Sequence, residues 1–137
     1  MNTTKITVQA VVSADKLKVW NYYTAPEHIT KWNFADPSWH CPSASNDLRI
    51  GGRYIARMEA KDGSFGFDFD AVYTDIHRGE NFTYEFGGRF ATVEFNAQNG
   101  TTEVIVTFDP ESEHPIDMQR NGWQAILNNF KHYTENN

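Results

Sequence analysis

The sequence predicts an α+β fold in which a curved antiparallel sheet of six to seven strands wraps around a long C-terminal helix. Three observations predict it. Residues 53–108 form a succession of alternating apolar and polar segments separated by short turns, which is typical of antiparallel strands. Two short helical segments follow the first strand. The last twenty or so residues have the spacing of one long helix, which is the only element long enough to cover a face of the sheet.

The N-terminal elements are a strand and a short helix. Apolar and polar residues alternate from Lys5 to Val12, which indicates a half-buried strand. Ser13 is the predicted N-cap of the helix that follows. Leu17, Trp20 and Tyr23 recur every third residue and give this helix an apolar face.

A second short helix, a loop and a tight turn are predicted next. Pro26 suits the first turn of the helix. The stretch 33–46 has two prolines, small polar residues and no clear period, so we expect a loop, which its aromatic content makes a candidate lid. Gly51 and Gly52 provide permissive backbone angles for the turn into the sheet.

The central strands place their aromatic residues on one face. Lys61, Asp62 and Gly63 form a predicted hairpin turn. In the strand after it, one face carries Phe65, Phe67, Phe69, Ala71 and Tyr73. Asp68 and Asp70 alternate with these residues, so they are expected to be solvated rather than to form a catalytic carboxylate pair.

The C-terminal segment from about His114 to Thr134 is predicted to be one helix. A rough three-four spacing, typical of one helix face, connects Ile116, Arg120, Trp123, Leu127, Phe130 and Thr134, with Ile126 and Tyr133 beside them. Gly122 lies inside this helix, where glycine costs about 1 kcal/mol relative to alanine. We expect it to allow close approach to the sheet or to leave room for a ligand beside Trp123.

Composition and charge restrict the function. The chain has 137 residues, the size of a single domain (residues 1–137), with 12 basic and 18 acidic residues. A net charge of −6 without a basic cluster argues against nucleic-acid binding. The single cysteine excludes an intrachain disulfide. No signal peptide and no apolar run long enough to insert into a membrane are recognised, so a cytoplasmic location is expected.

Six features in order over nearly the whole chain resemble the START-like, helix-grip superfamily. More narrowly, they resemble small bacterial proteins of the family named after the activator of the ninety-kilodalton heat-shock protein ATPase. The features are Val19-Trp20, the stretch containing Pro26, Glu27, Ile29 and Trp32, residues 47–54 (DLRIGGRY), residues 62–65 (DGSF), residues 72–76 (VYTDI) and Gly122-Trp123. The resemblance implies a seven-stranded sheet that grips the last helix and leaves a hydrophobic cavity between them. It also suggests that the Gly51-Gly52 turn lies near the mouth of this cavity.

The resemblance and the inward-facing aromatic residues together predict a site for a small hydrophobic molecule, such as a lipid, a polyketide or an aromatic compound. The candidate lining residues are Tyr54, Met58, Phe67, Phe69, Tyr84, Trp123 and Leu127, with Trp32 and Trp39 at the mouth. The alternative is that these side chains fill a solid core. No cofactor, metal ligand or catalytic residue is assigned, because the five histidines have no paired ligand spacing.

Two other functions stay open. Some relatives with this fold are cyclases, dehydratases or hydrolases, but an enzyme needs an ionisable group facing the cavity, and the sequence places none there. His40 and Cys41 do not by themselves form a nucleophile or a metal site. A chaperone partner or a stress-related interaction role rests on family analogy alone. A homodimer through an exposed sheet edge is the remaining expectation.

Overall fold

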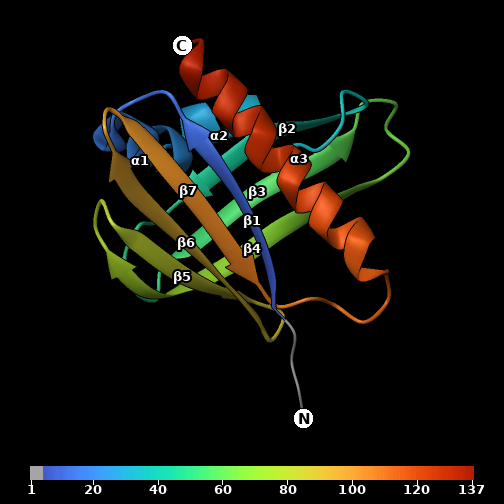
Figure 1. Cartoon of the computed structure of the whole chain (residues 1–137). Coiled ribbons are helices and arrows are strands. Elements are labelled where there is room, and N and C mark those ends of the chain that lie inside the picture. The colour runs from blue at the N-terminus through green and yellow to red at the C-terminus, as the bar shows by residue number, and fades with distance from the viewer. Residues whose placement is uncertain (1–4) are drawn as a thin grey trace.

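The computed structural model describes residues 5–137 and contains the predicted α+β architecture (Figure 1). In chain order the elements are β1 (Ile6–Val12), α1 (Lys16–Thr24), α2 (Pro26–Trp32), β2 (Trp39–Asn46), β3 (Arg53–Ala60), β4 (Gly66–His77), β5 (Asn81–Phe86), β6 (Arg89–Gln98), β7 (Thr101–Phe108) and α3 (Ile116–Glu135). All seven strands belong to one antiparallel sheet in the order β1-β7-β6-β5-β4-β3-β2. The predicted fold class is confirmed. None of the helices in this part of the chain is both long and apolar enough to cross a membrane.

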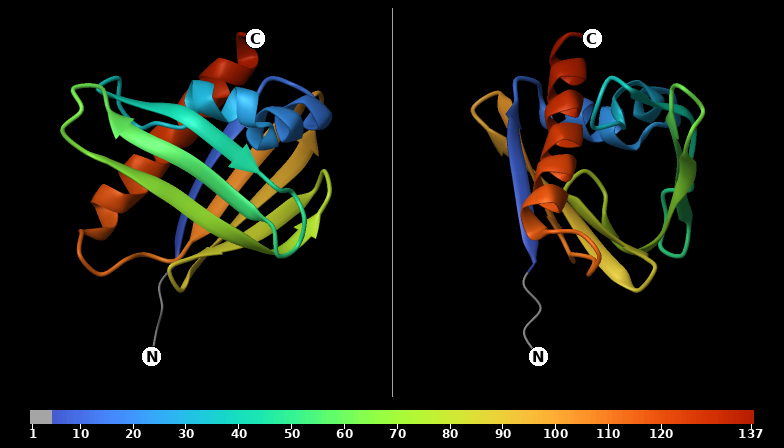
Figure 2. Two further views of the ribbon diagram at one scale, coloured as in Figure 1. Left: turned by 180° about the vertical axis from the view of Figure 1, so that it is seen from behind. Right: turned by 90° about the vertical axis from the view of Figure 1, so that its right-hand side faces the viewer.

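The sheet is bent into a trough that holds α3. In the right-hand view of Figure 2, β1 and β7 form one wall, β5 and β6 the floor, and β2 and β3 the opposite wall. The helix α3 packs along β1, and α1 and α2 close the upper end of the trough. The wall formed by β1 and β7 therefore contacts the helix, whereas the opposite wall, formed by β2 and β3, stands away from it.

Two side-chain amides fix α3 in this position. Gln124 donates from Nε2 to the backbone oxygen of Gln9 at 3.0 Å, and its Oε1 accepts from the Gln9 backbone nitrogen at 3.4 Å. These bonds occupy the outer edge of β1, which would otherwise present unpaired backbone groups. Asn129 donates to the backbone oxygen of Trp32 at 2.8 Å and so ties α3 to the end of α2.

The last helix begins two residues after the predicted start, at Ile116. Ile116 itself is exposed, as is Arg120, so the face defined by the three-four spacing is not buried at its N-terminal end. The buried face starts at Gln119, whose side chain bonds to the backbone of the preceding loop, and continues through Leu127. The predicted helix otherwise agrees with α3.

The segment 33–46 is not the predicted loop throughout, because its second half forms the edge strand β2. The pairing with β3 shifts register between His40 and Ser43, and Pro42 lies in that bulge. Proline lacks the N–H that a ladder needs, so it is tolerated at an edge bulge where a central strand would exclude it.

The predicted N-cap of α1 is wrong by two residues. The Asp15 side chain accepts a hydrogen bond from the backbone nitrogen of Lys18 at 2.8 Å and caps the helix. Ser13 instead donates its backbone N–H to the carboxylate of Glu135 at 2.8 Å. Leu17 is exposed, so the inward face of α1 is shorter than the spacing predicted.

Gly51 and Gly52 are required by the turn into β3. Gly51 has a φ of +83°, in the left-handed region that glycine adopts without strain. A Cβ on Gly52 would lie 2.1 Å from the backbone oxygen of Asp47, closer than any side chain can approach. The tight-turn interpretation is therefore confirmed, but neither glycine lines the cavity described below, so their expected place at its mouth is wrong.

Candidate functional site

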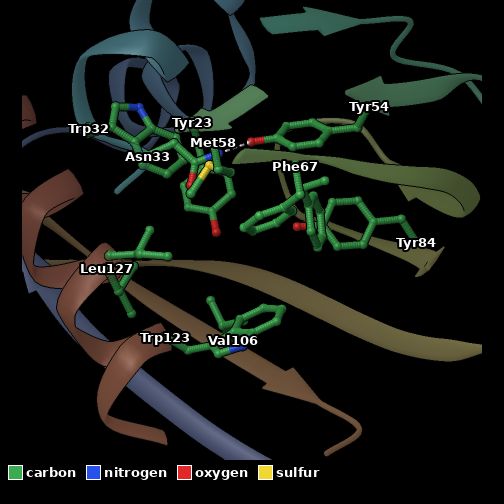
Figure 3. Close-up of a pocket in the computed structure, with 12 residues that line it drawn as sticks. Tyr23, Trp32, Asn33, Tyr54, Met58, Phe67, Tyr84, Val106, Trp123 and Leu127 are labelled. Atoms are coloured by element: carbon green, nitrogen blue, oxygen red, sulfur yellow. Dashed lines mark hydrogen bonds between the residues drawn. The ribbon is translucent and has the colours of Figure 1, made fainter. Parts of the chain in front are cut away.

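A cavity of about 170 Å³ lies between α3 and the far wall of the trough (Figure 3). It is lined by Tyr23, Trp32, Asn33, Tyr54, Met58, Phe67, Phe69, Tyr84, Val106, Trp123, Ile126 and Leu127. These residues come from all three helices or their ends and from β3, β4, β5 and β7. Most of the lining is aromatic or aliphatic, and the space lies where the sequence analysis expects it, under the last helix.

Eight of the nine candidate residues surround this one cavity. They are Trp32, Tyr54, Met58, Phe67, Phe69, Tyr84, Trp123 and Leu127. Trp39 does not line it, although its ring lies 6.2 Å from that of Phe67. That these residues contact a ligand stays a prediction.

The mouth of the cavity lies beside Phe67. This side chain lines the cavity and is also 43% exposed, so the space reaches the surface next to it. The predicted place of Trp32 at the mouth is wrong, because Trp32 is only 2% exposed and forms an inner wall. Trp39 and Phe65 flank Phe67 on the outside, with their rings 5.9 Å apart.

Three aromatic residues of the lining each lie opposite an alanine on one neighbouring strand, although Tyr84 also pairs with Tyr73, and Met58 pairs with Phe67. Tyr54 pairs across the ladder with Ala71, and Tyr84 pairs with Ala91. Phe69 likewise faces an alanine on β3. Because directly opposed side chains are about 5 Å apart, an alanine beside each ring leaves the ring free to project over the sheet. The inner surface is therefore stepped rather than filled.

The helical wall is fixed by Trp123. Its ring stacks on Phe108 with centroids 3.9 Å apart and planes 11° apart. On its other side it approaches Phe69 of β4 at 6.4 Å in an edge-on arrangement. This contact joins the helix to the far wall at one end and bounds the cavity there.

Four lining residues were not among the predicted ones: Tyr23, Asn33, Val106 and Ile126. The helical spacing places Tyr23 on the buried face of α1 without indicating what it faces. Ile126 is recognised only as a neighbour of the apolar stripe of α3. Asn33 follows α2 and was assigned to a loop, so no sequence signal marked it as part of a binding site.

The hydroxyl and amide groups of the lining are three phenols and one amide. The lining also holds the indole N–H groups of Trp32, which donates to the backbone oxygen of Tyr22 at 3.0 Å, and of Trp123. Burial is the main cause that raises the pKa of Tyr23, Tyr54 and Tyr84 above the ordinary value, and neighbouring tyrosines raise each further. All three are therefore protonated at any physiological pH. The amide of Asn33 donates to the Tyr54 hydroxyl at 3.3 Å. Within residues 5–137 no carboxylate, imidazole, amine, guanidinium or thiol lines the cavity.

The other candidate groups lie outside the cavity. Asp70 forms an ion pair with Arg53 on the outer face of the sheet at 2.6 Å, and Asp68 lies 3.5 Å from Arg57. Both acids are exposed, as predicted. Burial raises the pKa of the Cys41 thiol to about 11, which makes it a poor nucleophile. In the described part of the chain, no three metal-ligating side chains cluster together.

Comparison with known proteins agrees with this architecture. Residues 13–135 match the family model described as activator of Hsp90 ATPase homolog 1-like protein. No curated protein matches the chain significantly.

Solved structures match over nearly the full length. The solution structure of the AHSA1-like protein from Aeromonas hydrophila is 38% identical, with a TM-score of 0.91 over 97% of this chain and 93% of the other. A solution structure from Cytophaga hutchinsonii is 47% identical, with a TM-score of 0.83 over 96% of this chain and 92% of the other. A crystal structure from Chromobacterium violaceum is 21% identical, with a TM-score of 0.84 over 96% of this chain and 98% of the other, and this likeness concerns the fold alone.

Proposed function

The chain belongs to the activator of Hsp90 ATPase homolog 1-like family, with its START-like fold, and from that premise we propose that it binds a small aromatic molecule in the cavity beneath α3. One observation carries the proposal. A chain rich enough in aromatic side chains to fill its interior instead keeps an apolar space of about 170 Å³ with a few polar groups around it. Pockets of this composition are the usual form of small-molecule sites.

The size of the cavity selects among the ligand classes. An apolar cavity of about 150 Å³ is known to hold benzene, whereas drug-sized ligands occupy roughly 300–1,000 Å³. A space of about 170 Å³ therefore suits a compound with one ring. A lipid or a multi-ring polyketide would protrude past Phe67 into solvent, so the aromatic class fits best.

The test is an NMR titration with single-ring compounds, followed through the indole N–H signals of the four tryptophans. We expect the signals of Trp32 and Trp123 to shift, because both rings line the cavity. The signal of Trp20 should stay in place, because this residue packs against Phe95 outside the lining. Equal shifts of all four signals, or none with any compound, would contradict the proposal.

Thermal unfolding gives an independent measure. A ligand at about 100 times its dissociation constant adds about 2.7 kcal/mol of stability. The matched control is Val106→Phe, which places a ring in the cavity from β7. This variant should lose the ligand-induced rise in melting temperature while keeping the circular dichroism of the parent. If it binds as well as the parent, the ligand is held elsewhere.

The enzyme alternative gains no support from the lining. Phenols of raised pKa can donate hydrogen bonds but are poor general bases, and the cavity residues provide no stronger base. The chaperone-activator alternative still rests on the family's name. A pulldown with the cognate chaperone and an ATPase assay test it.

A further inference from the structure

The hydroxyl groups of the cavity indicate what kind of molecule it takes. Tyr23, Tyr54 and Tyr84 come from α1, β3 and β5 and are only 8%, 3% and 5% exposed. Their side chains converge, and Figure 3 shows the hydroxyls of Tyr23 and Tyr84 pointing into the open space. Buried tyrosine hydroxyls normally find a hydrogen-bond partner.

The tyrosines outside the cavity follow that rule. Tyr22 donates to the backbone oxygen of Asn137 at 3.0 Å, and Tyr73 donates to Oδ1 of Asn46 at 2.8 Å. The Tyr133 hydroxyl lies 2.7 Å from Nδ1 of His28.

Two cavity tyrosines do not follow it. Within residues 5–137, no protein group forms a hydrogen bond with the hydroxyl of Tyr23 or of Tyr84. The hydroxyl oxygen of Tyr54 accepts a hydrogen bond from Asn33, so the Tyr54 hydroxyl can still donate its own proton to a ligand. The six tyrosines thus divide by location, and the unpaired hydroxyls are those aimed at the cavity.

The charge of the lining excludes one class of partner. Each of these hydroxyls has a proton to donate, and a carbonyl oxygen with its two lone pairs can accept from two of them at once. A carboxylate would also accept, but the described lining holds no cation to pair with it. Burying an unpaired charge costs far more than a hydrogen bond returns.

We propose that the cavity recognises a neutral single-ring compound through a carbonyl oxygen, which accepts hydrogen bonds from the hydroxyls of Tyr23 and Tyr84. This inference rests on the proposed function, since it names the ligand class of the same site. The inference adds that the two hydroxyls determine which ligands are selected, whereas the apolar walls determine only the size of ligand that fits.

The test uses three probes of nearly the same shape. Acetophenone has the carbonyl, ethylbenzene lacks any oxygen, and benzoate is charged. Titration calorimetry with the full chain should show acetophenone binding about 100-fold more tightly than ethylbenzene, because each of the two hydrogen bonds contributes a factor of about ten. Benzoate should bind more weakly than either at neutral pH.

The variants remove one oxygen atom at a time. Tyr84→Phe and Tyr23→Phe should each lower the affinity for acetophenone about tenfold and leave that for ethylbenzene unchanged. Their melting temperatures should not fall, because no bond within the protein is lost. Tyr73→Phe is the matched control: it loses a hydrogen bond to Asn46 outside the lining, so its stability should fall while the preference for acetophenone stays.

The outcomes separate this inference from the proposed function. If ethylbenzene binds as tightly as acetophenone, the cavity is a binding site but the hydroxyls do not select, and the inference is wrong. Tightest binding by benzoate overturns the neutral-ligand argument. If no probe binds to the parent protein at all, the proposed function fails together with the inference.

Discussion

Replacing Gly122 with alanine should stabilise the protein. This glycine is the seventh residue of α3, where it costs about 0.8–1.0 kcal/mol relative to alanine. The expected close approach to the sheet is wrong, because a Cβ built at this position would meet no heavy atom within 4 Å beyond the helix's own neighbouring turns. The gain in helix propensity is therefore not offset by a clash, and we expect Gly122→Ala to add close to 1 kcal/mol.

The magnitude can be expressed as a melting temperature. At about 2.1 cal/mol/K per residue, unfolding a chain of 137 residues has an entropy near 0.3 kcal/mol/K, so the gain corresponds to about 3 °C. Urea unfolding should show a higher midpoint with an unchanged slope, since the exposed surface stays the same. Ligand binding should also be unchanged, because Gly122 does not line the cavity.

Gly63 is the matched control. A Cβ there would also meet nothing within 4 Å, but its φ is +79° in the β3–β4 turn. Alanine in the left-handed region costs about 1–2 kcal/mol, so Gly63→Ala should destabilise where Gly122→Ala stabilises. The same sign for both variants would refute the reasoning, since the two sites differ in backbone conformation and not in available space.

Three further predictions concern the core and two side chains. Phe130→Ala should lower the free energy of unfolding by about 3–5 kcal/mol in urea titration, because the ring is fully buried among aromatic neighbours. Cys41, with its pKa raised to about 11, should react with iodoacetamide at pH 8 at least about 100-fold more slowly than a free cysteine, and at the ordinary rate once urea unfolds the chain. Glu111 raises the pKa of His114 and its own is lowered in return. The stability contributed by the raised pKa of His114 is therefore fully present below its ordinary pKa near 6.5 and is lost as the pH rises through the raised pKa. The stability contributed by the lowered pKa of Glu111 is fully present above its ordinary pKa near 4.5 and is lost as the pH falls through the lowered pKa. An NMR titration of Glu111→Gln should show the His114 midpoint moving back toward 6.5.

The alternation of apolar and polar residues predicts on which face of a strand a side chain lies, but it does not predict how far other elements bury that face. Phe67, Phe69 and Tyr73 of β4, with Phe65 just before the strand, were placed on one face, and their exposure falls from the hairpin toward the centre of the sheet. Where the trough opens, an inward residue such as Phe67 is still exposed. The extent of cover depends on the position of α3, which no local pattern encodes.

The edge strand β2 shows that a proline in the sequence does not by itself exclude a β-strand. Pro42 and the small polar residues around it predict irregular structure, and only the neighbouring β3 supplies the bonds that make the segment a strand. Its burial is weak and uneven, so no period of two marks it. The pairing partner, rather than the strand's own composition, decides its structure.

The site was predictable where it depended on sheet alternation and not where it depended on the ends of helices. Tyr54, Met58 and Tyr84 follow from the strand pattern alone. Tyr23 and Asn33 join them only because α1 and α2 close the end of the trough, which is a tertiary arrangement. The sequence therefore concealed Tyr23 and Asn33, while it predicted the other two hydroxyl-bearing residues of the lining, Tyr54 and Tyr84.

The arrangement of unpaired hydroxyls is itself an argument for a ligand. Neither Tyr23 nor Tyr84 uses its hydroxyl in a bond within the described chain. Within residues 5–137 the only fully enclosed side-chain oxygen or nitrogen without a partner is Oγ1 of Thr134, so the two tyrosine hydroxyls reach the cavity space. Phenylalanine at either position would keep the ring packing and remove a hydroxyl that the protein itself does not use. Proteins depart from such local rules mainly at functional sites. Two departures that point into one cavity, in a chain whose other tyrosines are all paired, are better explained by a bound oxygen atom than by the packing of the core.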